Sequence, residues 1–152
     1  MISEALLDQV IDDLTEEEID MVAFYTNMAR TMPVLTSYLT DQDTELLTDR
    51  EHDYLLYLAM VLLRAGSAVG AAEEDADPAE LETREEAAWE ALNACGARPL
   101  DRLRERTPFE AVVPNFILDA LEVDEDLDFV TEPGGQLLYV KLITMAGVLL
   151  PD

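Results

Sequence analysis

The chain has 152 residues, of which 34 are acidic and nine are basic, so its formal net charge is −25. This length is enough for a hydrophobic core, and an apolar fraction of 49% is too high for a disordered chain. The single cysteine excludes an internal disulfide framework and any multi-cysteine metal site. The strongly negative field disfavours direct binding to nucleic acids and to anionic membranes, because both carry phosphates.

The bases are almost all arginine, and Lys141 is the only lysine. An acid-rich, lysine-poor composition favours a halophilic protein that works in a saline cytosol. Residues 1–14 have no basic region and carry acids inside their apolar pattern, so we do not expect a secretory signal. These features together predict a cytoplasmic location.

Hydrophobic spacing predicts helices nearly throughout, and the expected fold is an all-α bundle of six to seven helices in one domain over residues 1–152. In chain order the expected helices span roughly 3–14, 16–31, 34–40, 48–72, 79–95, 108–122 and 135–149.

Four N-capping patterns support these boundaries, because a side-chain oxygen or an N-terminal proline suits the unpaired first turn of a helix. They are Thr15 with Glu18, Thr48 with Glu51, Asp77 before Pro78, and Thr107–Pro108 before Glu110. Pro114 predicts a kink or a restart inside the sixth expected helix. Gly134–Gly135 predicts a turn before the last one.

Two segments, 54–72 and 137–150, are nearly all apolar. The first is close to the ~20 residues of a membrane span, but Arg64 in its middle would cost at least ~2.5 kcal/mol on insertion. We therefore expect a central apolar helix at about 48–72 and an apolar C-terminal helix at about 135–149, both packed on several sides, and no membrane span.

The least apolar stripe of the first apolar helix carries almost no acid, although the chain is rich in acids. Either the monomer covers this stripe, or a second subunit does. We expect a homodimer, since twofold dimers are the commonest assembly, with Arg64 and Lys141 paired to carboxylates. The expected interface residues are Tyr57, Met60, Arg64, Gly66, Gly70 and Lys141.

Three acids at alternate positions, Asp124, Asp126 and Asp128, resemble the first ligands of a calcium loop. The rest of that pattern fails, because Phe129 stands where the loop needs glycine and Gly135 where it needs glutamate. These three acids are weak metal candidates, and the sequence predicts no dedicated metal site and no cofactor.

Nucleophilic catalysis has little support in the sequence. Cys95 lies near an expected helix C-terminus, where the helix dipole disfavours a thiolate. His52 lies beside Glu51 and Asp53 in the first turn of another helix. We expect Cys95 to be a core residue and His52 a surface residue, so no catalytic residue is predicted.

Four arginines fall within nine residues, against the overall charge of the chain. If 99–106 is helical, Arg98, Arg102 and Arg106 share one face at spacings of four. This face pairs with nearby acids, or it forms a small patch for an anion or a partner.

These observations predict a non-catalytic helical protein that acts through protein–protein contact as a homodimer, with a basic protein as a further candidate partner. One alternative is an acidic nucleic-acid mimic that inhibits a DNA- or RNA-binding protein, which would need its acids along one elongated face. A second alternative is a magnesium-dependent phosphohydrolase that uses helical carboxylates, for example Glu16, Glu17 and Asp20, or Glu82, Glu85 and Glu86.

Overall fold

A computed structural model describes residues 2–17, 20–122 and 129–150 of the chain. Within these residues the fold is all-helical, as expected, with eight α-helices rather than six to seven, one 3-10 helix and no strand. The elements are α1 (Glu4–Glu16), α2 (Met21–Thr31), α3 (Pro33–Leu39), η1 (Gln42–Leu46), α4 (Asp49–Ala68), α5 (Pro78–Cys95), α6 (Pro99–Arg106), α7 (Val112–Ala120) and α8 (Glu132–Leu149).

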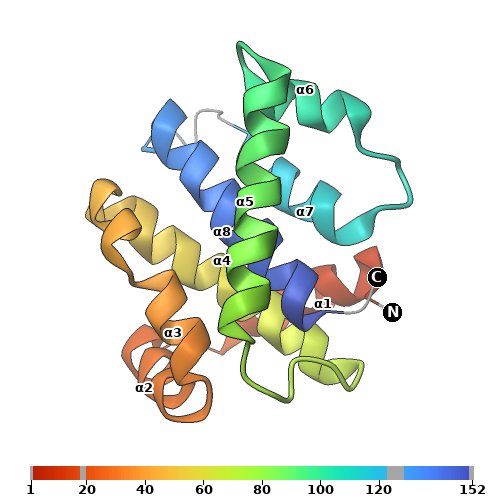
Figure 1. Cartoon of the computed structure of the whole chain (residues 1–152). Coiled ribbons are helices and arrows are strands. Elements are labelled where there is room, and N and C mark those ends of the chain that lie inside the picture. Colours follow the sequence, from red (N-terminus) through yellow and green to blue (C-terminus); the bar gives the residue numbers. More distant parts are fainter. Residues whose placement is uncertain (1, 18–19, 123–128, 151–152) are drawn as a thin grey trace.

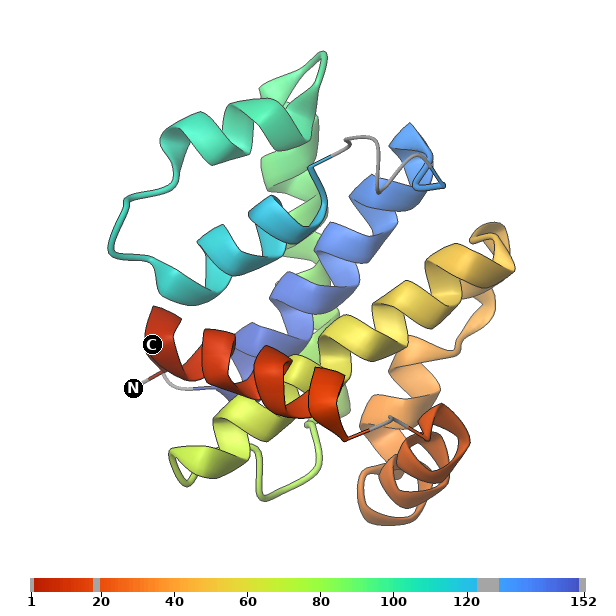
Figure 2. The same ribbon diagram turned by 180° about the vertical axis from the view of Figure 1, so that it is seen from behind.

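Helix α8 runs through the middle of the molecule and contacts α3, α4, α5 and α7 (Figure 1). Helix α4 lies against α8 on one side and against α1 and α2 on others (Figure 2). The two apolar helices expected from the sequence are thus the two central helices. The α2–α3 pair and the α6–α7 pair lie at opposite ends of the molecule in both views.

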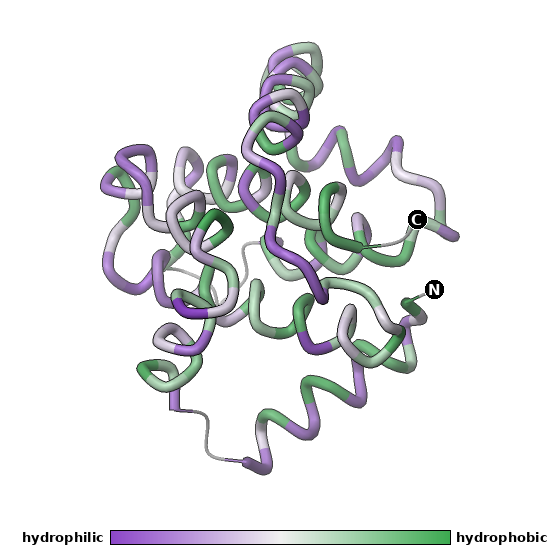
Figure 3. Tube along the Cα trace, turned by 60° about the horizontal axis from the view of Figure 1, so that its bottom comes forward, coloured by the Kyte–Doolittle hydropathy of each residue, from purple (hydrophilic) through white to green (hydrophobic). Residues whose placement is uncertain are grey.

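Burial on several sides of α8 explains its nearly continuous apolar sequence. Leu138, Leu142 and Met145 are completely buried, and each such side chain stabilises the fold by about 1.5–3 kcal/mol. Helix α1 shows the opposite pattern, because polar and apolar residues alternate along it (Figure 3). Its buried residues, Leu7, Val10 and Leu14, recur at spacings of three and four and face the core.

Two of the four predicted caps are confirmed. Thr48 and Glu51 form a complete capping box that begins α4, with Glu51 N donating to Thr48 Oγ1 and Thr48 N donating to Glu51 Oε1. Asp77 accepts from Ala79 N at the start of α5, and Pro78 is the first residue of that helix.

The other two predicted caps are wrong. Thr15 lies inside α1, where its hydroxyl donates to the carbonyl of Ile11, and α2 begins instead after Asp20. The hydroxyl of Thr107 likewise donates to the carbonyl of Leu103 and closes α6. Helix α7 begins only at Val112, and this places Pro114 in its first turn, so the expected restart occurs there.

The last helix begins three residues earlier than expected. Thr131 is its N-cap and accepts from Gly134 N, and Pro133 lies in the first turn, where its missing N–H costs nothing. Gly134 and Gly135 are therefore buried helical residues, and the predicted turn at this position is wrong.

Helix α4 ends at Ala68, four residues before the expected end. Gly70 has φ of 77°, a left-handed conformation that glycine adopts without strain and that is typical of the end of a helix. The chain then turns towards Asp75, whose carboxylate accepts from Val34 N and Leu35 N. Asp75 thereby caps α3, which has no capping side chain of its own.

Candidate functional site

Three of the six expected interface residues are covered by other parts of the same chain. These are Met60, Gly66 and Lys141. A Cβ on Gly66 would lie 2.5 Å from Leu150 Cδ2, so this glycine permits a close approach of the C-terminal end of α8 within the monomer. The monomer itself therefore accounts for the absence of acid at these three positions.

The other three expected interface residues reach the surface to different degrees. Arg64 is exposed and forms an ion pair with Glu17 at 3.0 Å, which joins α4 to the end of α1. Tyr57 is half-buried, and burial raises the pKa of its hydroxyl above 10. Gly70 is exposed in the turn after α4.

Lys141 forms a buried ion pair rather than an interface contact. Its Nζ lies 2.7 Å from Asp41 Oδ2, 3.3 Å from Glu85 Oε1 and 3.8 Å from the ring centroid of Tyr38. Two carboxylates and the face of a ring thus surround the three N–H groups of the ammonium. The Tyr38 hydroxyl also donates to Glu85 Oε1, and burial together with the nearby Glu85 and Asp41 carboxylates raises its pKa.

This cluster is a structural junction rather than a reactive site. Its members come from α3, the start of η1, α5 and α8, and the side chain of Lys141 has no exposed surface. Both carboxylates already contact the ammonium, which leaves no room for a substrate beside it. The cluster therefore holds four elements around the middle of the molecule.

The segment 21–40, which forms α2 and α3, contains no acidic residue and one base, Arg30. This lack of acidic residues is notable in a chain with 34 acids, because each of the remaining α-helices carries exposed carboxylates. The surface of α2 is also partly apolar: Val22 is 76% exposed and Tyr25 39% exposed. A solvated helix in so acidic a protein would carry carboxylates, so this surface is unusual.

A groove of about 500 Å³ lies between α2 and α4, on the flank of α2 that carries Ala23, Asn27 and Thr31, and neither Val22 nor Tyr25 lines it. Its walls combine polar and apolar residues, and the apolar ones include Phe24, Leu63 and three methionines, Met28, Met32 and Met60. Glu17, Asp20 and Arg64 also line it. Two residues of the predicted interface, Met60 and Arg64, thus border the groove, although Met60 is almost completely buried.

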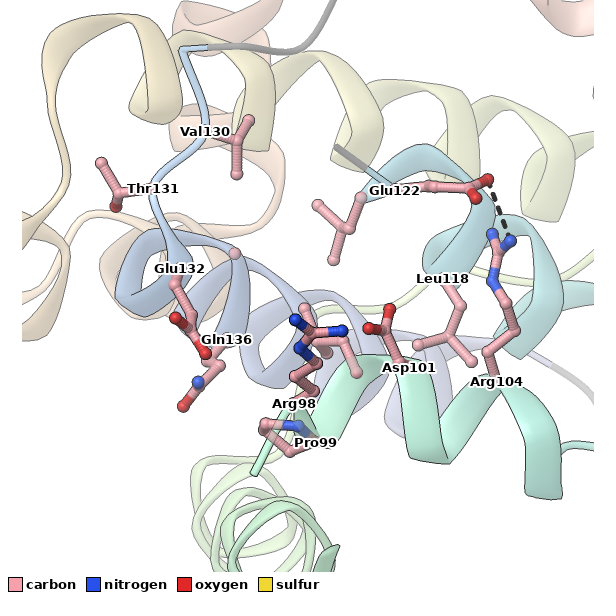
Figure 4. Close-up of a pocket in the computed structure, with 13 residues that line it drawn as sticks. Arg98, Pro99, Asp101, Arg104, Leu118, Glu122, Val130, Thr131, Glu132 and Gln136 are labelled. Atoms are coloured by element: carbon pink, nitrogen blue, oxygen red, sulfur yellow. Dashed lines mark hydrogen bonds and ion pairs between the residues drawn. The ribbon is translucent and has the colours of Figure 1, made fainter. Parts of the chain in front are cut away.

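A second cavity of about 500 Å³ lies between α6, α7 and the start of α8 (Figure 4). Arg98 and Asp101 from α6 point into it, and Glu132 and Gln136 border it from α8. Arg104 binds Glu122 and Asp119 of the α7 segment, so its charge is already neutralised within the protein.

The arginines of the predicted patch do not act as one surface. Segment 99–106 is helical, as the prediction required, but Arg102 donates to the carbonyl of Ala97 and Arg106 to the sulfur of Cys95. Arg98 lies at the N-cap with φ of 51° and lines the cavity of Figure 4. Of the three, it is the one that lines this cavity.

No group of three or more His, Cys, Asp or Glu side chains that could hold a metal ion occurs among the described residues. The candidates Asp124, Asp126 and Asp128 lie outside these residues. The phosphohydrolase alternative needs acids that face inward. Glu16, Glu17, Asp20, Glu82 and Glu86 are exposed instead, and Glu85 is held by Lys141 and Tyr38.

Cys95 is buried at the end of α5, as expected, and its sulfur donates to the carbonyl of Ala91. His52 is half-buried rather than fully at the surface, and its Nε2 lies 3.3 Å from the carbonyl of Leu39. Neither residue lines the cavity of Figure 4 or the groove between α2 and α4. Among the described helices, none has the length and the apolar character that a membrane span would need.

Comparison with protein-family models, with curated proteins and with solved structures finds no match to this chain. The sequence reasoning missed two features of the sites described above. One is the acid-free segment 21–40, which a plot of charge along the chain would have found. The other is the partner set of Lys141, for which the sequence offered no local pattern.

Proposed function

We propose that this protein acts through protein–protein contact as a homodimer, and that two copies meet through the acid-free exposed surface of α2 that carries Val22 and Tyr25. The observation that carries the proposal is the absence of acid from residues 21–40, where Val22 and Tyr25 are exposed. The proposal places a second copy of the chain in this position and requires no catalytic residue.

Charge is the reason that a second copy fits this surface. Two chains of −25 repel each other, and each pair of like charges 4 Å apart costs about 1 kcal/mol in water. A contact through an acid-rich helix would bring many such pairs together. A contact through α2 avoids this, because residues 21–40 contribute no carboxylate. A basic partner protein would be attracted to the carboxylates elsewhere, so the acid-free surface favours self-association over that partner.

The exposed side chains of α2 support the same conclusion. Val22 and Tyr25 are three residues apart and share one side of α2. A twofold contact would use the same residues on both copies.

The observations favour neither alternative function. A nucleic-acid mimic needs one elongated acidic face, but exposed carboxylates occur on α1, α4, α5, α6, α7 and α8, which do not lie along one line (Figures 1 and 2). The phosphohydrolase needs converging acids, which the described residues do not supply.

The test is the mass in solution, measured by size-exclusion chromatography with light scattering in about 0.1 M and about 1 M potassium chloride. The screening length falls from about 10 Å to about 3 Å over this range, so the dimer should strengthen with salt. We expect twice the chain mass of 17.0 kDa at high salt. A monomer at both salt concentrations would contradict the proposal.

A pair of double variants locates the contact. Val22→Glu with Tyr25→Glu places two acids on α2 and should give a monomer at both salt concentrations. Leu46→Glu with Phe109→Glu is the matched control, because Leu46 is 84% and Phe109 92% exposed outside the proposed surface. The control should dimerise as the wild type does. Equal dissociation of both variants would show that the dimer uses another surface.

A further inference from the structure

We propose that the cavity between α6, α7 and α8 binds a small zwitterion with an apolar body, such as an α-amino acid with an aliphatic or aromatic side chain (Figure 4). The volume of about 500 Å³ lies within the range of small-molecule sites. This cavity and the α2 surface lie at opposite ends of the molecule, so the inference does not depend on the homodimer.

Arg98 supplies the positive charge of the site. Each of the other eight bases contacts a carboxylate, another polar oxygen, a sulfur or an aromatic ring. Among the described residues, the guanidinium of Arg98 has no such partner, although the chain carries 34 acids. It points into the cavity from the start of α6 (Figure 4). A planar guanidinium left free in this way is the natural partner of a ligand carboxylate.

Asp101 and Glu132 supply the negative charges. Asp101 points into the same space as Arg98, and Glu132 borders the cavity from α8 (Figure 4). Neither carboxylate forms an ion pair within the described part of the chain, whereas Glu122 is neutralised by Arg104. Among the described residues that line the cavity, the charges without an ion-pair partner are therefore one cation and two anions. A plain anion would meet two carboxylates, and a plain cation would leave Arg98 unpaired, so a zwitterion fits best.

One part of the cavity wall is apolar. Leu118, Leu121 and Val130 line it and are almost completely buried, so they form a floor beneath the charged groups. An aliphatic or aromatic side chain placed on this floor would be removed from water, and this stabilises the complex. A zwitterion without an apolar body would gain nothing from these residues.

The first experiment is isothermal titration calorimetry of the full chain with leucine and with phenylalanine. Leucinamide lacks the carboxylate and N-acetylleucine lacks the ammonium, so each analogue removes one of the two proposed ion pairs. We expect both analogues to bind at least about tenfold more weakly than leucine, the loss expected of one charge-assisted hydrogen bond. Absence of binding by both amino acids up to about 10 mM would overturn the proposal, as would equal affinities for leucine and its two analogues.

Variants then locate the site. Arg98→Gln should lower the affinity for leucine about tenfold. It should leave the affinity for leucinamide unchanged, because leucinamide has no carboxylate to pair with Arg98. Arg102→Gln is the matched control, since Arg102 is exposed on the same helix but does not line the cavity. Circular dichroism shows whether each variant is folded. An equal loss of leucine affinity in the two variants, or no loss in Arg98→Gln, would place any binding elsewhere and overturn the proposal.

Discussion

Glu51 Oε2 accepts two hydrogen bonds from Thr131, 80 residues further along the chain, one from its backbone N–H and one from its hydroxyl, each of 2.9 Å. Glu51 Oε1 accepts a third from Thr48 N. Thr48 and Thr131 are the N-caps of α4 and α8. One carboxylate with 1% of its surface exposed therefore ties together the N-termini of the two central helices.

The first prediction concerns the charge on Glu51. Burial acts to raise the pKa of this carboxyl, but the hydrogen bonds from Thr48 and Thr131 outweigh it and hold the pKa below the ordinary value of 4.5. Glu51→Gln replaces one acceptor oxygen with an amide that cannot accept a hydrogen bond. We expect urea unfolding at pH 7 to show a loss of about 1–3 kcal/mol.

The same variant should show a defined pH dependence. Because the pKa is lowered in the folded state, the ionised group stabilises the fold above the unfolded pKa, and this stability is lost as the pH falls through the folded pKa. The difference between wild type and Glu51→Gln should therefore be constant above about pH 5 and shrink below 4.5. Exposed Glu45, replaced by glutamine, is the control. A difference that persists unchanged in acid would contradict this account.

The second prediction compares two adjacent glycines in the first turn of α8. A Cβ on Gly134 would lie 1.8 Å from Glu51 Oε2 and 2.7 Å from Thr131 Oγ1, so Gly134→Ala must push the junction apart. We expect this change to cost at least about 2 kcal/mol in thermal or urea unfolding. A Cβ on Gly135 would meet Val130 and Leu100 at 3.4 and 3.5 Å, which is ordinary contact.

Gly135→Ala is therefore the internal control for this pair. Alanine favours the helix by about 1 kcal/mol over glycine, so the variant should be as stable as the wild type or slightly more stable. If the two alanine variants lose the same stability, the contact with Glu51 is not what requires glycine at position 134.

The third prediction concerns Lys141, which is completely buried between Asp41 and Glu85. Lys141→Met keeps much of the volume but leaves two half-buried carboxylates near each other without their cation. Breaking a buried pair in this way should cost about 3 kcal/mol in urea unfolding. Arg64→Met removes an exposed pair with Glu17 and should cost less than about 1 kcal/mol. Similar losses in the two variants would contradict the assignment of Lys141 as the central junction.

The fourth prediction concerns the cap that Asp75 provides to α3. Asp75→Ala leaves Val34 N and Leu35 N without their acceptor, so α3 should fray and stability should fall by about 1 kcal/mol. Hydrogen exchange at these two amides should become faster, while the amides of α5 stay protected. Exposed Glu74, replaced by alanine, is the control and should change neither quantity.

Local patterns predicted much of the fold because they depend on neighbouring residues alone. The capping box at Thr48 and the Asp77–Pro78 start of α5 involve contacts over three residues or fewer, and both are confirmed. Where two local solutions competed, the pattern was insufficient. Thr15 could cap a new helix or bond back to Ile11, and the packing of Leu14 in the core extends α1 past it.

The candidate sites depended more on tertiary structure. The acid-free segment 21–40 is visible in the sequence, and so is the cluster of four arginines that begins at Arg98. The groove beside α2 and the cavity beside Arg98 form only when helices from distant parts of the chain come together. The amino-acid order shows where charges are missing or clustered, but a concave surface requires several elements.

Lys141 illustrates the physical reason for this division. Its position in an apolar helix indicated from the amino-acid order alone that a cation would be buried and would need a carboxylate. The chain offers 34 acids, and the periodicity of a helix carries no information about which of them lies opposite. Tertiary packing brings Asp41, which is 100 residues away, and Glu85 to Lys141. Burial removes water as a competing partner, so the ammonium pairs with the two carboxylates within its reach.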